Sequence, residues 1–235
     1  MQYTGFWPVV RKALIDSISL PAFILLTTMI GFGSLARSAG FSADMAWVAT
    51  VAIWGLPGQL AMLDLTASGQ NFVTIIVACS LANARFLPMV VSFLPWINTG
   101  KFGLGRATLA AQMLSINSWA ICLRQFPLID KPWRRVYYST FASSIILAAI
   151  VGTLIGYHGA GALPVWVVLG FIFTSPLFFA LVLSSAKGAS ARWALLFGCI
   201  LIPITTRWLP SVDLLVTGVV GGTAAFLVGR KRLIK

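Results

Sequence analysis

Apolar stretches separated by short polar connections run along almost the whole chain. Eight of them come close to the roughly 20 residues that a helix needs to cross a hydrocarbon core of about 30 Å. They cover approximately residues 18–36, 45–67, 72–94, 107–123, 137–157, 164–184, 193–209 and 213–229. This pattern predicts an all-α, polytopic integral membrane protein of seven or eight hydrophobic helices, in a single transmembrane domain over residues 1–235.

The fourth apolar stretch leaves the number of crossings open. It is short and carries Gln112, Ser115, Asn117 and Ser118, so it either crosses or stays re-entrant or interfacial. Eight crossings put twelve basic residues inside and four outside, whereas seven put thirteen inside and three outside. Cytoplasmic connections are enriched in Lys and Arg, but both counts obey that rule and it does not separate them. Both alternatives place the basic C-terminal tail in the cytoplasm.

The second apolar stretch contains a helix-breaking, partly polar pentapeptide, Gly55-Leu56-Pro57-Gly58-Gln59. Lipid offers no partner to the backbone groups that such a break frees. A break is therefore tolerated only where protein buries it or where it lines a wet cavity. We expect a broken helix here, with Gly55 and Pro57 at the hinge.

The break has a counterpart later in the chain. A shift of 119 positions pairs Pro57 with Pro176, and it gives 11 identities over the 37 positions from 33 to 69, where about three are expected by chance. We interpret this as an internal repeat of units 18–94 and 137–209, with a second broken helix at Ser175 and Pro176. Eight spans make the repeats parallel and seven make them inverted; the inverted form is slightly favoured because it suits alternating access.

Composition supports the membrane class. Hydrophobic residues make up 59% and charged residues 9%, and the mean hydropathy is +0.93, which excludes an ordinary soluble domain. The net charge of +12 is explained by basic connections and a basic tail rather than by nucleic-acid binding. The three cysteines lie inside apolar stretches without metal-ligand spacing, and no catalytic motif is present, so we expect neither metal, cofactor nor enzyme activity.

A few polar residues lie within the apolar stretches. Arg85 is flanked by apolar residues on both sides, and such an arginine costs about 2.5–3.5 kcal/mol unless a partner or water meets it. Arg85 either holds a substrate carboxylate, or it locks the fold by capping exposed carbonyls or by pairing with Asp64. Asp64 is either a coupling carboxylate or an interfacial one. The predicted substrate-binding residues are Gln59, Asn83, Arg85, Asn117, Gly58 and Ser175.

Several motifs, in their order and spacing, resemble those of one family. They are Gly31-Phe-Gly33-Ser-Leu-Ala-Arg-Ser-Ala-Gly40, Trp54-Gly-Leu-Pro-Gly-Gln59, Asn83-Ala-Arg85-Phe-Leu-Pro, Tyr137-Tyr138, Gly152-Thr-Leu-Ile-Gly156 and Pro176-Leu-Phe-Phe-Ala180. They are similar to motifs of the AzlC-like permeases, the large subunit of bacterial branched-chain amino-acid exporters. The resemblance implies export of branched-chain amino acids, and of methionine, across the cytoplasmic membrane, with a small AzlD-like membrane subunit as partner.

The chain departs from that family where acids and a histidine are usual. Phe86 replaces a histidine, Ile116-Asn117 replaces an acidic pair, and an acidic residue near Phe171 is absent. The expected function is proton-coupled export of branched-chain amino acids, and of methionine, through the lipid bilayer. The alternatives are a transporter or channel for another small solute, and a partner subunit without transport activity of its own.

Overall fold

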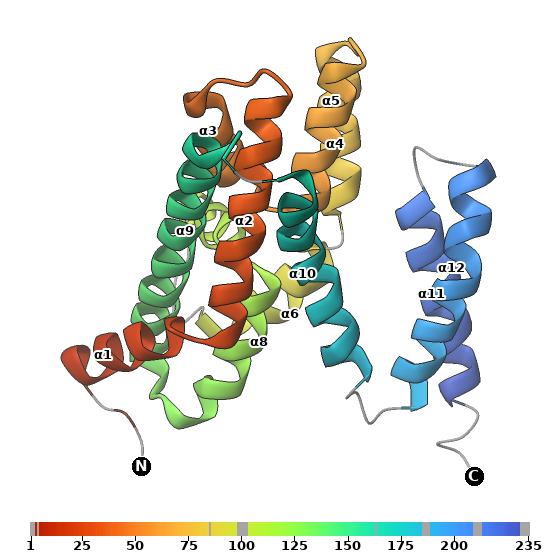
Figure 1. Cartoon of the computed structure of the whole chain (residues 1–235). Helices are drawn as coiled ribbons and strands as arrows, with labels where there is room; N and C mark the ends of the chain where they lie inside the picture. Colours follow the sequence, from red (N-terminus) through yellow and green to blue (C-terminus); the bar gives the residue numbers. More distant parts are fainter. Residues whose placement is uncertain are drawn as a thin grey trace.

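The computed structural model describes residues 3, 5–84, 86–97, 103–162, 164–184, 189–208 and 213–230; within its helices, the side chains at 175, 178–184, 189–192, 213–215 and 229–230 lie outside the description. The regular structure over these residues is helical, apart from one isolated bridge between Tyr3 and Ile129. The α-helices are α1 (Phe6–Ser17), α2 (Leu20–Ser38), α3 (Ala43–Ile53), α4 (Leu56–Ala67), α5 (Phe72–Asn83), α6 (Phe86–Ile97), α7 (Leu104–Gln112), α8 (Ile116–Gln125), α9 (Arg134–Gly159), α10 (Val165–Ser184), α11 (Ala189–Trp208) and α12 (Asp213–Arg230) (Figure 1). Two short 3-10 turns, Phe126–Leu128 and Lys131–Trp133, join α8 to α9.

The expectation of seven or eight helices was wrong, because the described residues form twelve α-helices. Three of the apolar stretches, 45–67, 72–94 and 107–123, are each divided into two helices, and α1 adds one more. Each division falls where a polar or helix-breaking residue interrupts the apolar run. By length and hydropathy, α2 and the stretch Lys131–Gly159 are able to cross a membrane, and α5 with α6 makes a third candidate if this pair, bent by 58°, counts as one span.

Helices α2 and α9 form the centre of the molecule and run in the same direction (Figure 1). A Cβ at Gly152 would meet the carbonyl of Leu26, and one at Gly156 would collide with the carbonyl of Ile30 further along. Arg37, near the end of α2, donates to the carbonyl of Tyr157 at 3.1 Å. Small residues allow this close approach of two backbones. The parallel course corrects the inverted repeat favoured above, since α2 and α9 begin the two proposed units.

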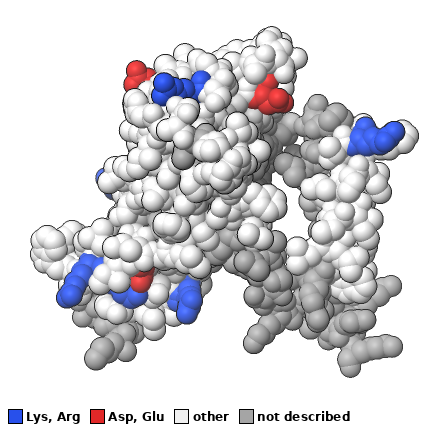
Figure 2. All heavy atoms as spheres, viewed as in Figure 1, with Lys and Arg blue, Asp and Glu red and all other residues white. Residues whose placement is uncertain are grey.

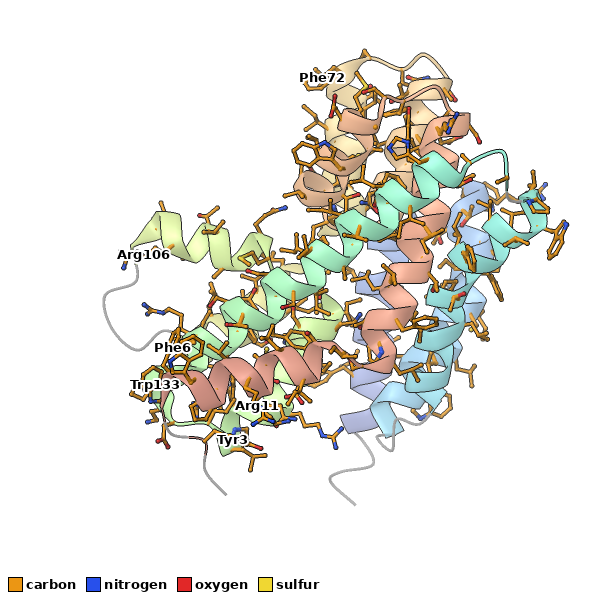
Figure 3. The ribbon with its side chains drawn as sticks, turned by 60° about the vertical axis from the view of Figure 1, so that its left-hand side comes forward. Tyr3, Phe6, Arg11, Phe72, Arg106 and Trp133 are labelled. Atoms are coloured by element: carbon orange, nitrogen blue, oxygen red, sulfur yellow. The ribbon has the colours of Figure 1, made fainter. Side chains whose placement is uncertain are left out.

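The first residue of α3 and the last residue of α4 lie at the same end of the molecule. In Figure 1, α2 and α9 run from the lower end to the upper end, α3 starts at the upper end, and α4 returns there to join α5. Phe72, the first residue of α5, lies at that upper end (Figure 3). The stretch 45–67 therefore turns back inside the molecule and does not cross it, contrary to its length and hydropathy.

Basic residues mark the lower end of the molecule. They belong to α1 and to the segment that joins α8 to α9, which lie together there (Figures 1 and 2). Helix α12 also ends at the lower end, where α1 lies (Figure 1). Within α1, Lys12 pairs with Asp16 at 2.5 Å, and the other carboxylate oxygen of Asp16 accepts a hydrogen bond from Tyr137 at 2.6 Å. These contacts fix α1 across the start of α9.

Candidate functional site

A cavity of about 340 Å³ lies at the break between α3 and α4, and we call it the break cavity. Its wall comes from α2, from the break between α3 and α4, from Phe86, from the start of α8 and from α10. It brings together five of the sequence-predicted residues, Gly55, Pro57, Gln59, Asn117 and Pro176. The remainder of the wall is largely aliphatic. An apolar cavity with a few convergent polar groups is the usual form of a small-molecule site.

The N-terminus of α4 forms the polar edge of the break cavity. Gly55 is its N-cap and supplies no side-chain hydrogen bond, and Pro57 sits in the first turn. The main-chain N–H groups of Leu56 and Gly58 precede the first intrahelical bond, which Gln59 donates to Gly55, so they have no acceptor within the helix. These amides and the helix dipole together favour a negatively charged group at this end.

Gln59 is the polar side chain that the fold leaves without a partner at this edge. It is fully buried, and neither its Nε2 nor its Oε1 has a hydrogen bond within the described residues. A buried polar group left unpaired costs about 1–3 kcal/mol, and native structures rarely keep one without a water or ligand to meet it. The amide of Gln59 is therefore suited to hydrogen-bond a polar ligand in the break cavity.

A second, larger cavity of about 760 Å³ lies on the other side of the break, and we call it the side cavity. It is bounded by α3, α4, α5 and the region from α7 to Leu114, and Phe72 at the upper end is among its lining residues. Trp54 and Phe86 line both cavities. These two aromatic side chains consequently form the wall between them.

Trp54 has an unusual backbone for a bulky residue. Its φ of 39° and ψ of 43° place it in the left-handed region, and it is the non-glycine residue with positive φ in the described part of the chain. Such conformations are rare for large side chains and persist only where the surroundings hold them. The indole Nε1 is buried and has no hydrogen-bond partner among the described residues.

Two side-chain amides hold the end of α3 in place. The Nδ2 of Asn83 donates to the carbonyl of Ile53 at 2.7 Å, and the Nε2 of Gln112 donates to the carbonyls of Val51 and Ala52, each at 2.9 Å. The last carbonyls of a helix lack intrahelical donors, and these amides satisfy them. Asn83, predicted to bind substrate, lines the side cavity and not the break cavity, and its Nδ2 is committed to the fold.

Gly55 and Gly58 are needed because Asn83 and Ile53 approach them closely. A Cβ at Gly55 would collide with Oδ1 of Asn83, and one at Gly58 would lie 2.8 Å from Cγ2 of Ile53. Gly58 lines neither cavity, and its carbonyl accepts a hydrogen bond from the Cys79 thiol at 3.2 Å. Its observed contacts are therefore packing contacts, and its predicted contact with substrate remains a prediction.

Asn117 lies in the first turn of α8 and lines the break cavity. Its Nδ2 donates to the carbonyl of Pro21 at 3.2 Å, which ties α8 to the start of α2. Ser115 and Ser118 close the N-terminus of α8 with a reciprocal capping box. The N-terminus of α8 is therefore already satisfied by its own chain, in contrast with that of α4.

The remaining predicted residues lie elsewhere. Asp64 is exposed in the last turn of α4, at the upper end, and lines neither cavity. Arg85 and the side chain of Ser175 lie outside the described residues. The second broken helix is a correction: α10 continues from Val165 to Ser184 with Pro176 inside it.

The sequence prediction missed Trp54 and did not foresee how Gln112 is used. The sequence position of Trp54, directly before the Gly-Leu-Pro-Gly break, could have indicated it as a site residue. Gln112 was recognised as polar on a doubtful segment, but its role depends on the carbonyls of α3, which are distant in the sequence.

Comparison with known families decides the broad identity. The profile of the family described as AzlC protein matches residues 21–163, which is more than half of the chain. The chain belongs to the AzlC family. This is a transporter family associated with branched-chain amino acids, not a family of enzymes. No curated protein and no solved structure matches the chain. The matched range contains the breaks between α3 and α4, between α5 and α6 and between α7 and α8, whereas α10 to α12 lie beyond it.

Proposed function

We propose that this AzlC-family chain exports branched-chain amino acids, and methionine as a further substrate, across the bacterial cytoplasmic membrane. The observation that carries the proposal is the break cavity, where the open N-terminus of α4 and the unpartnered amide of Gln59 meet an aliphatic wall. A carboxylate suits the helix end. The aliphatic chain suits Ile24, Leu25 and Met29 of α2 and Ile172 of α10, which line the same cavity.

The size of the cavity agrees with this substrate class. Ligand cavities range from about 300 to 1,000 Å³, and the break cavity, at about 340 Å³, lies at the small end of that range. Discontinuous helices that present their ends to a central site are a recurring arrangement among secondary transporters. The position of the cavity at the α3–α4 break supports transport over a purely structural role for that break.

We place the lower end in the cytoplasm. Arg11, Lys12, Arg124, Lys131, Arg134 and Arg135 belong to the elements at that end, whereas Arg37 and Arg207 end the helices that reach the upper end. Cytoplasmic connections carry the excess of Lys and Arg, so the C-terminus is proposed to be cytoplasmic. A reporter enzyme that is active only outside the cytoplasm, fused after Lys235, should stay inactive; activity would reverse the orientation.

A small AzlD-like membrane subunit is the proposed partner, and α7 is the proposed contact. Arg106 of α7 is exposed on the side of the molecule, away from both ends (Figure 3). An arginine facing lipid at this depth costs about 2.5–3.5 kcal/mol, so a partner bearing an acceptor or a carboxylate would relieve that cost. Arg106→Ala should reduce co-purification of the subunit, whereas Arg37→Ala should not; equal recovery from both variants would exclude this contact.

Coupling to the proton gradient is proposed together with the transport activity. Cells expressing the chain would be preloaded with leucine, isoleucine, valine or methionine, and efflux would be followed with and without the small subunit, before and after collapse of the gradient. Efflux that depends on both the chain and the gradient is expected. No efflux of any of the four under any condition would contradict the proposed function, and efflux unaffected by collapse would contradict the coupling alone.

A further inference from the structure

Several buried polar side-chain atoms without a hydrogen-bond partner lie around one point of the described chain, whereas Oγ of Ser19 lies apart from it. The atoms at this point are Nε1 of Trp54, both amide atoms of Gln59 and Oδ1 of Asn83, and all three residues belong to the α3–α4 break or to the helix packed against it. The other helix ends in this region are satisfied, since Asn83 and Gln112 donate to the end of α3 and Ser115 caps α8. The unpaired groups are thus concentrated where the break cavity meets the side cavity.

The groups that lack partners in the break cavity are mainly donors. The indole of Trp54 offers one N–H and no acceptor, and Gln59 offers two N–H and one carbonyl oxygen. The free main-chain amides at the start of α4 add further donors beside them. A ligand that complements this set is rich in acceptor oxygens, and a carboxylate satisfies it best. In a site of low dielectric constant, neutral donors bind an anion through strengthened, charge-assisted hydrogen bonds.

The group at the 2-position of the ligand meets a different environment. Within the described lining of the break cavity, the side-chain acceptors suited to an ammonium group are the neutral amide oxygens of Gln59 and Asn117 and the hydroxyl oxygens of Thr28 and Ser115. Such groups also tolerate a hydroxyl or a keto oxygen in place of the ammonium. The carboxylate and the aliphatic chain therefore dominate recognition.

From these observations, and resting on the proposed function, we infer that Trp54 and Gln59 bind the substrate carboxylate, and that aliphatic 2-oxo and 2-hydroxy acids form a second class of substrate. Trp54 supplies its indole N–H from the wall that separates the two cavities. The left-handed backbone at Trp54, held by the amides that fix the end of α3, keeps the indole at this wall. A carboxylate on Trp54 would lie at the boundary between the break cavity and the side cavity.

Three ligands of matched aliphatic chain test this inference on the unmodified protein. The full-length chain in lipid vesicles would be assayed for leucine transport in competition with 4-methyl-2-oxopentanoate, which lacks the ammonium, and with leucinamide, which lacks the carboxylate. The 2-oxo acid should compete within about ten-fold of leucine itself, and leucinamide should be at least about ten-fold weaker, as expected for loss of charge-assisted hydrogen bonds. Strong competition by leucinamide and none by the 2-oxo acid would overturn the inference.

Substitutions then assign the donors. Trp54→Phe keeps an aromatic wall and removes the N–H, and Gln59→Leu keeps the approximate volume and removes the amide. Each should weaken leucine and the 2-oxo acid by about ten-fold and by equal factors, because both ligands lose the same hydrogen bond. Trp47→Phe is the matched control: Trp47 donates to Asp44 on the exposed face of α3 and lines neither cavity, so its transport should equal that of the wild type.

Other outcomes separate this inference from the proposed function. If the wild type transports leucine while Trp54→Phe and Gln59→Leu retain wild-type affinity, the export proposal survives and the assignment of donors is wrong. If Arg85→Ala alone abolishes discrimination against leucinamide, Arg85 binds the substrate carboxylate and the inference is overturned. If the wild type does not move leucine but the 2-oxo acid binds directly, by isothermal titration in lipid nanodiscs, the export proposal fails and the carboxylate site stands.

Discussion

Pro57 and Pro176 occupy equivalent positions in the proposed repeat, yet only Pro57 lies at a break. The chain at Pro57 leaves α3, passes through the left-handed Trp54 and restarts as α4, whereas α10 continues through Pro176. Inside a continuous helix a proline removes one hydrogen bond, as Pro176 does in α10, whereas in the first turn of a helix, where Pro57 lies, it removes none. The difference lies in the partners, because Asn83 and Gln112 supply amide donors to the carbonyls at the end of α3.

This comparison shows that a proline breaks a buried helix only where the tertiary structure replaces the lost backbone bonds. At the first break, Gly55 also gives Asn83 the room to approach. In α10, Gly170 has open space around its Cα, and the hydroxyl of Thr174 bonds back to the carbonyl of Gly170 within the same helix at 2.9 Å. This hydroxyl bond stays within α10 and brings no donor from another helix.

The largest expected effect comes from filling the space that the break requires. In Gly55→Ala, the new Cβ collides with Oδ1 of Asn83 and lies 3.2 Å from Cε2 of Phe86. We expect a loss of about 1–3 kcal/mol in stability and loss of leucine transport. Gly170→Ala meets nothing within 4 Å and should leave both unchanged or raise stability slightly. Thermal unfolding in detergent measures stability, and vesicle assays measure transport. Equal stability and equal transport in the two variants would contradict the difference between the break at Gly55 and the continuous α10.

The next largest loss of stability is expected from removing the side-chain amides that donate to the last carbonyls of α3. Asn83→Ala leaves the carbonyl of Ile53 without its donor, and Gln112→Ala does the same for Val51 and Ala52. Each should destabilise the protein by about 0.5–1.5 kcal/mol and reduce transport. Thr174→Val removes a hydrogen bond inside the continuous α10 and serves as the control, with a smaller loss. A melting temperature for Asn83→Ala no lower than that of Thr174→Val would contradict the stabilising role of the amides.

Exchanging the prolines themselves should have a smaller effect on stability and should separate the two sites by activity. Pro57→Ala loosens the first turn of α4 and costs about 0.4–1 kcal/mol, and we expect slower transport because the free amides of α4 are less well fixed. Pro176→Ala restores a helical hydrogen bond in α10, so transport should persist with equal or higher stability. Unchanged kinetics in Pro57→Ala would make that proline a packing residue.

The smallest effect is expected at Asp64. Its side chain is exposed at the upper end and lines neither cavity, so Asp64→Asn should leave leucine efflux and its response to the proton gradient unchanged. Efflux that becomes independent of the gradient in this variant would instead restore Asp64 as the coupling carboxylate.

The sequence led to the break at Gly55 and Pro57 and to Gln59, because a glycine-proline motif with an amide is conspicuous inside an apolar run. It also indicated Asn117, through the polar residues of the doubtful fourth segment. It did not foresee that the Nδ2 of Asn83 donates to the end of α3, because an amide after an apolar helix looks the same whether it caps another helix or binds a ligand; the predicted contact of Asn83 with substrate remains a prediction. It overlooked Trp54, since the residue type gives no sign of a left-handed backbone.

The sequence by itself determined the helical class of the protein and the interruption at Gly55 and Pro57. Hydropathy and the local chemistry of Gly, Pro and Gln act over a few residues and can be read directly. Only the tertiary structure decided that α3 and α4 return to one end, that α2 and α9 run parallel, and that α10 stays continuous. Each of these depends on which distant carbonyl finds a donor and which backbones can approach closely, and those pairings, between Asn83 and Ile53 or between Gly156 and Ile30, exist only once the helices have packed.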